Sequence, residues 1–154
     1  MRIAITSILA FAYFFLPKYG YDSQSGIAQH LLSPISHANI FHLAANIVCL
    51  WMIKCPVNIL ITYPICVIAS FFPSFFLYGD SLTMGFSGVL FAMVGITWGR
   101  IDAFNRMFSK NKWYLIIPFF IPNINAFIHV YCLLFGFAYG LYLNNISQSV
   151  CNRR

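Results

Sequence analysis

The stretch that decides the fold is residues 85–98, GFSGVLFAMVGITW, in which no charged side chain interrupts the apolar residues. Uninterrupted apolar character over this length is typical of a helix with little contact with water. Five more stretches share it, and the six predicted helices cover residues 3–16, 38–53, 57–78, 86–98, 113–121 and 126–143. A lipid span normally takes about 20 residues, so several of these helices are short.

The composition places these helices in a membrane. Hydrophobic residues make up 60% of the chain and charged residues only 8%, whereas an ordinary soluble domain is about 25% charged. So few charges could not cover a water-facing surface, and the surrounding solvent must be largely lipid. We therefore expect an all-α membrane protein, a six-helix bundle that forms one domain over residues 1–154 without a soluble domain.

The basic residues indicate the topology. They lie between apolar runs rather than on one face, so membrane orientation explains the net charge of +6 better than nucleic-acid binding does. With six spans and a cytoplasmic N-terminus, every basic residue except Lys18 lies inside, as the positive-inside rule favours. Both termini are then cytoplasmic. No A-x-A cleavage site follows residues 3–16, so we expect a retained first helix rather than a signal peptide.

Four polar side chains stand where lipid makes them costly. His42 and Asn46 are four residues apart and share one helix face, Ser87 opens the fourth helix, and His129 lies just inside the sixth. Polar groups inside a membrane mark function by default. The second, fourth and sixth helices all run inward from outside, so the four groups lie at one depth in the outer part of the bilayer. They can therefore converge in one pocket.

These residue types suit acyl transfer. A serine hydroxyl becomes a strong nucleophile when a base takes its proton, and His129 is the natural base for Ser87. The N-terminus of a helix favours the negative charge of an oxyanion. The expected donors to that oxyanion are the Ser87 N–H, the Asn46 amide and the His42 imidazole, each worth about 2.7–4 kcal/mol in barrier height.

Small residues would bring these groups together. Gly85 and Gly88 allow a sharp turn and a close approach to a substrate backbone. Gly136 and Gly140 form a GxxxG pair on the sixth helix, a pattern that lets two helix backbones pack closely. Phe91 lies one turn after the serine, so we expect its ring to stack against the imidazole of His129.

Together these motifs resemble the rhomboid intramembrane serine proteases. In chain order they are His37-x4-His42-x3-Asn46, Gly85-x-Ser87-Gly88 and a lone His129 on the last helix. The resemblance covers about residues 28–140 and implies a Ser–His dyad without a third acid. By matching position, Ser87 is the nucleophile, His129 the general base and acid, and His42 and Asn46 belong to the oxyanion site. His37 would be structural or line the water-filled entrance.

The resemblance also implies the setting of the reaction. Rhomboids cut single-pass membrane proteins near the outer end of the substrate helix, and they use no cofactor or metal. The implied location is the inner membrane of a bacterium, as a multi-pass protein. Two departures are visible, because Ala28 and Gln29 stand where many rhomboids carry Trp-Arg, and Phe91 replaces a frequent tyrosine. The first leaves the anchoring of the first loop open.

Three other functions were weighed. A channel or transporter would spread polar residues through the whole depth, but the inner halves of these helices are apolar. A metal site of His37, His42 and His129 lacks a carboxylate or thiol at matching depth. A catalytically inactive relative that binds membrane proteins differs from the enzyme in not reacting with a fluorophosphonate. His30 is expected to be a loop histidine without a role.

Overall fold

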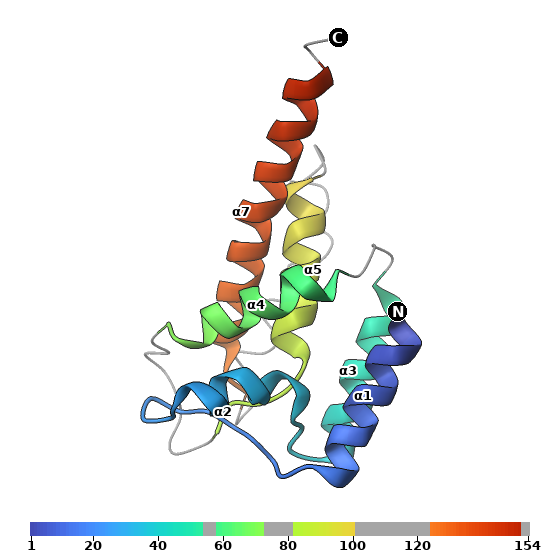
Figure 1. The fold of residues 1–154 in the computed structure, drawn as a ribbon, viewed down its shortest axis with the longest axis vertical. Coiled ribbons are helices and arrows are strands. Elements are labelled where there is room, and N and C mark those ends of the chain that lie inside the picture. Colours follow the sequence, from blue (N-terminus) through green and yellow to red (C-terminus); the bar gives the residue numbers. More distant parts are fainter. Residues whose placement is uncertain (54–57, 73–81, 101–123, 152–154) are drawn as a thin grey trace.

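The computed structural model describes residues 1–53, 58–72, 82–100 and 124–151, and these residues fold into helices joined by loops. In chain order the helices are α1 (Arg2–Phe15), α2 (Ile27–Leu32), the 3-10 helix η1 (Ser33–Ile35), α3 (Ile40–Met52), α4 (Ile59–Ser70), α5 (Ser87–Gly99) and α7 (Ala126–Cys151). The all-α prediction is confirmed for these residues. Figure 1 shows α5 and α7 side by side, with α1 and α3 forming a second pair.

Helices α5 and α7 touch through their backbones. A Cβ atom placed on Gly136 would lie 2.3 Å from the carbonyl oxygen of Ala92, and one on Gly140 would lie 2.4 Å from that of Ile96. The contact is reciprocal, because a Cβ on Gly95 would lie 2.2 Å from the carbonyl oxygen of Leu133. No side chain fits between the helices at these positions. Only small residues permit such an approach, and it aligns the two helices along their length.

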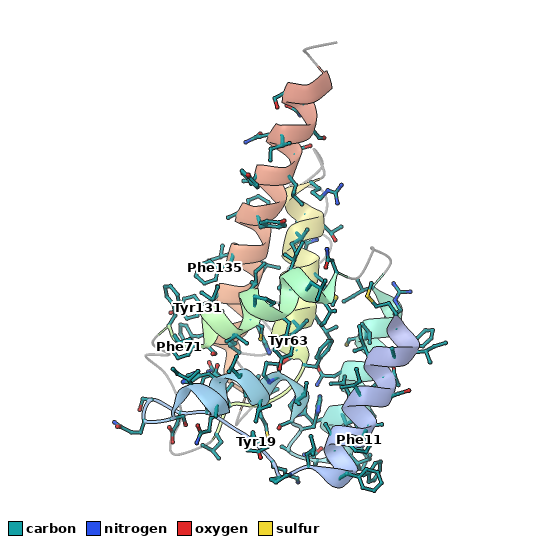
Figure 2. All side chains as sticks on the ribbon, viewed as in Figure 1. Phe11, Tyr19, Tyr63, Phe71, Tyr131 and Phe135 are labelled. Carbon is teal, nitrogen blue, oxygen red and sulfur yellow. The ribbon has the colours of Figure 1, made fainter. Side chains whose placement is uncertain are left out.

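The remaining helices pack around this pair. Helix α4 crosses α5 and α7, and its Cys66 and Ala69 are buried against them. Helix α1 is tied to α3 by the Trp51 indole N–H, which donates to Thr6 Oγ1 over 3.2 Å. Large apolar side chains such as Phe11 remain exposed on the outer faces, as lipid contact requires (Figure 2).

Some helix ends differ from the predicted ones. Helix α4 ends at Ser70, although the sequence predicted a helix through residue 78, because Pro73 disfavours helical backbone at Phe72. Helix α7 continues to Cys151 rather than residue 143, since residues 144–151 contain no proline or glycine that would end the helix. The predicted helix at 113–121 lies outside the described residues.

The lengths of the helices limit what they can span individually. Among the described helices, only the stretch Ala126–Ser149 of α7 is long and apolar enough to cross a bilayer. A second candidate arises only if the pair Ile27–Ile35 and Ile40–Met52, bent by 71°, is counted as one span. Helices α1, α4 and α5 are apolar but shorter, and the sequence predicted the short length of α1 and α5 but not that of α4.

Loop 1, residues 17–37, is folded rather than irregular. It contains α2 and η1, which the sequence analysis missed, and it buries His30 to 5% exposure. The imidazole stacks on Phe71 at 4.1 Å between ring centroids and lies 4.6 Å from the Tyr21 ring. His30 Nδ1 lies 2.8 Å from Ser70 Oγ, which itself donates to the carbonyl of Val67, so the imidazole N–H is the donor. His30 is therefore not the loop histidine that the sequence predicted, because it lies on α2 and joins loop 1 to α4.

We predict that Gly136→Leu destabilises the protein by about 1–3 kcal/mol or more, because a side chain must force α5 and α7 apart. Ala138→Leu is the matched control, since Ala138 lies on the exposed side of the same helix. Thermal unfolding in detergent micelles measures both. Equal unfolding temperatures for the two variants would contradict the packing described here.

We predict that His30→Ala lowers stability by about 1–3 kcal/mol, because it leaves a buried hydroxyl without its donor. Burial also lowers the pKa of His30 from its ordinary 6.5, so the unfolded chain binds this proton more readily than the folded one. His30 therefore makes its full contribution to the free energy of unfolding above pH 6.5. That contribution is lost as the pH falls through the pKa of His30 in the folded protein. Unfolding curves against pH should show a smaller loss on acidification for His30→Ala than for the parent. Gln24→Ala, an exposed change in the same loop, should match the parent.

Candidate active site

The first residue of α5 faces the first turn of α7. Ser87 Oγ lies 2.8 Å from His129 Nε2, a hydrogen bond between groups 42 residues apart in the chain. His129 is buried, at 7% exposure. A hydroxyl at hydrogen-bond distance from an imidazole is the arrangement in which the imidazole can take its proton.

A small residue allows close packing at the start of α5 too. A Cβ on Gly88 would lie 2.6 Å from Cys66 Sγ on α4 and 3.2 Å from Cys132 Sγ on α7. The start of α5 is therefore enclosed by both neighbouring helices. Because Gly88 directly follows Ser87, this close packing fixes the first turn of α5 and the serine with it.

The His129 ring is oriented by stacking. Phe91 lies parallel to it, with 4.5 Å between ring centroids and 10° between the planes. Among the described residues, His129 Nδ1 has no hydrogen-bond partner, so no carboxylate orients the ring from behind. Aromatic packing therefore orients the His129 ring, with Nε2 toward the serine.

His42 lies against the turn that leads to Ser87. Gly85 has a φ of +124°, which side-chain-bearing residues rarely adopt, and a Cβ there would lie 2.7 Å from His42 Nε2. His42 is held at the start of α3, where its backbone N–H donates to the Asn39 side chain over 2.9 Å. The imidazole therefore packs on the Gly85 backbone, two residues before the serine.

Asn46 is buried one turn further along α3. Its amide nitrogen donates to the carbonyl oxygen of His42 over 2.9 Å. One amide hydrogen is thus used within α3. A contact with an oxyanion at Ser87 would need the second hydrogen or a rotation of the side chain.

His37 supports the turn from inside the protein. At 1% exposure it does not line an open entrance, and its Nε2 accepts the backbone N–H of Phe86 over 3.4 Å. The ring meets that of His42 edge-on, with 5.2 Å between centroids. Of the two roles that the sequence left open for His37, these contacts fit the structural one.

Hydrogen bonds from loop 1 and from Asn125 hold the Ser87 loop, residues 82–86, in place. Tyr21 and Thr83 exchange both backbone hydrogen bonds, at 2.9 and 2.8 Å, and the Gly85 N–H donates to the Ser33 carbonyl over 2.9 Å. The Asn125 amide donates to Thr83 Oγ1 over 3.0 Å. No motif marks Tyr21, Thr83 or Asn125 in the sequence, because isolated polar residues in loops form no recognisable pattern.

Comparison with known proteins identifies the family of this chain. A family model described as the Rhomboid domain matches residues 24–146, which is most of the chain. The fold and the match define an integral membrane protein with a helical bundle. The chain belongs to the rhomboid family, the intramembrane proteases that act on membrane proteins within the bilayer. No curated protein and no solved structure matches it.

We predict that Gly85→Ala destabilises the protein by about 1–3 kcal/mol, because alanine is strained at positive φ and its Cβ would collide with His42. Gly26→Ala is the control, since Gly26 has a φ of −77° and only the end of a flexible Gln29 side chain nearby. Thermal unfolding measures the difference. If Gly85→Ala unfolds at the parent temperature, the turn is not constrained as described.

Proposed function

We propose that this chain is an intramembrane serine endopeptidase that cleaves transmembrane segments of single-pass membrane proteins near the outer face of the bilayer. Ser87 is the nucleophile and His129 the general base and acid. The observation that carries the proposal is the 2.8 Å distance between Ser87 Oγ and His129 Nε2. Membership of the rhomboid family supports it.

The reaction proceeds in two stages. In the first, Ser87 Oγ attacks the scissile carbonyl while His129 Nε2 takes the hydroxyl proton, and Nε2 then gives that proton to the leaving nitrogen. The product is an acyl-enzyme ester on Ser87. In the second stage a water molecule, deprotonated by His129, attacks the ester, and Ser87 leaves with the proton restored.

The negative charge of each tetrahedral intermediate needs donors. The Ser87 backbone N–H lies in the first turn of α5, where N–H groups have no intrahelical acceptor. His42 Nε2 lies close to the Gly85 backbone, and Asn46 has a second amide hydrogen. A donor in such a site is worth about 2.7–4 kcal/mol of the barrier. We propose these three groups as the oxyanion site.

The topology belongs to the same proposal. Six spans with both termini in the cytoplasm would put the starts of α5 and α7, and so Ser87 and His129, in the outer half of the bilayer. The positive-inside distribution of basic residues supports this orientation. We propose the inner membrane of a bacterium as the location.

A second serine–histidine pair, Ser70 and His30, allows a comparison with Ser87 and His129. Ser70 Oγ also lies 2.8 Å from a histidine, His30. However, its hydroxyl proton points to the Val67 carbonyl, and Ser70 is the last residue of α4, where the helix dipole disfavours negative charge. Ser87 has the opposite setting, a helix N-terminus. A fluorophosphonate should therefore react with Ser87 and leave Ser70 unmodified.

We predict that Ser87→Ala and His129→Ala each lower cleavage of a transmembrane reporter by about 10⁴-fold or more, as loss of a nucleophile or base does in serine proteases. Ser70→Ala is the matched control and should keep cleavage and fluorophosphonate labelling. The assay uses a panel of single-pass helices in liposomes, with product masses measured. Cleavage retained by Ser87→Ala would rule out the mechanism. A folded parent protein that neither cleaves nor labels would favour an inactive, substrate-binding relative.

A further inference from the structure

Thr83 joins the two segments that carry the serine and the histidine. It precedes Ser87 by four residues, and Asn125 precedes His129 by four. The Asn125 amide donates to Thr83 Oγ1 over 3.0 Å. We propose that Thr83 and Asn125 are a positioning pair that sets the spacing between Ser87 and His129. The inference rests on the proposed catalytic role of those two residues.

The backbone contacts of the glycines do not extend to the starts of the helices, where Gly88 meets the side chains of Cys66 and Cys132 instead of a backbone. The backbone contacts between α5 and α7 begin at Ala92 with Gly136 and at Gly95 with Leu133, and they continue inward from there. Ser87 and His129 both lie outside this stretch, toward the helix starts. Side chains shift more easily than backbones, so the spacing of the helix starts is set more sharply where a further hydrogen bond joins them.

The Asn125–Thr83 bond supplies that contact. Two hydrogen bonds link the segment 83–87 to the segment 125–129. One joins Ser87 to His129 and the other joins Asn125 to Thr83, so the two segments are connected at both ends. Two segments joined by two hydrogen bonds separate less easily than two segments joined by one. Loss of the Asn125–Thr83 bond would leave the serine–histidine distance free to vary.

Thr83 is also fixed to the rest of the molecule. Both of its backbone polar groups are paired with Tyr21, whose ring is buried and packs on His30. His30 in turn is bonded to Ser70 on α4. Thr83 therefore cannot simply follow a displaced Asn125, so the bond constrains α7 relative to a fixed point.

In the proposed mechanism neither Thr83 nor Asn125 contacts the substrate. Thr83 Oγ1 and Asn125 act on the reaction through the positions of Ser87 and His129. Their removal should therefore lower the rate of the chemical step and leave substrate affinity nearly unchanged. A residue with only a general structural role would lower the unfolding temperature without this selective effect.

The test is a double-mutant cycle with Thr83→Val, Asn125→Leu and the double variant in the full chain. Fluorophosphonate labelling rates at Ser87 and kcat and KM for a transmembrane reporter are measured. Each single change should lower kcat and labelling roughly ten- to a hundredfold, because a misplacement of about 1 Å can cost about 10²-fold. KM should stay within about twofold, and the double variant should be no slower than the slower single one.

The controls separate the possible outcomes. Thr97→Val removes a hydroxyl that bonds within α5 to Met93, and it should keep the parent rate. Thr83→Ser keeps the acceptor oxygen and should recover most of the rate. Should Thr83→Val fail to fold, Asn125→Leu with Thr83→Ser still tests the bond, because both keep the Thr83 hydroxyl, which also interacts with the Tyr21 side chain.

Three results would overturn the positioning role and leave the proposed function standing. They are parent values of kcat and of the labelling rate in both single variants, losses that multiply in the double variant, or a change in KM without a change in kcat. A parent protein without labelling or cleavage would overturn the proposed function and this inference with it.

Discussion

The contact between the backbones of α5 and α7 is the constraint on which the rest of the structure depends. Glycines on both helices meet carbonyl oxygens of the other at distances where a Cβ could not be placed. Since no side chains intervene, the helix starts can also lie close enough for Ser87 and His129 to form a hydrogen bond. In lipid there is no hydrophobic driving force for apolar helices to associate, so this packing and a few polar contacts must hold the pair together.

A second constraint comes from loop 1, which holds the turn before Ser87 from the opposite side. Backbone hydrogen bonds with Tyr21 and Ser33 fix that turn, and the buried stack of His30 fixes the loop to the end of α4. Many rhomboids carry Trp-Arg where this chain has Ala28 and Gln29. Here the neighbouring residue, His30, provides the anchor.

Residue spacing predicted the part of the site that lies on helices. The stack of Phe91 on His129 and the close approach at Gly136 follow from helical periodicity and small side chains, and both are present. Periodicity could not predict the folded state of loop 1, because the hydrogen-bond partner of His30 is Ser70, 40 positions away in the chain. Nor could it find the Asn125–Thr83 bond, since two loop residues that are distant in sequence leave no local pattern.

A crystal structure of the protein after reaction with a fluorophosphonate in a lipidic phase tests the central claim most directly. We expect a phosphonyl group bonded to Ser87 Oγ, with His129 Nε2 still adjacent and the phosphoryl oxygen facing the Ser87 N–H and His42. An unmodified Ser87, an adduct on Ser70 instead, or a His129 ring turned away from the serine would contradict it.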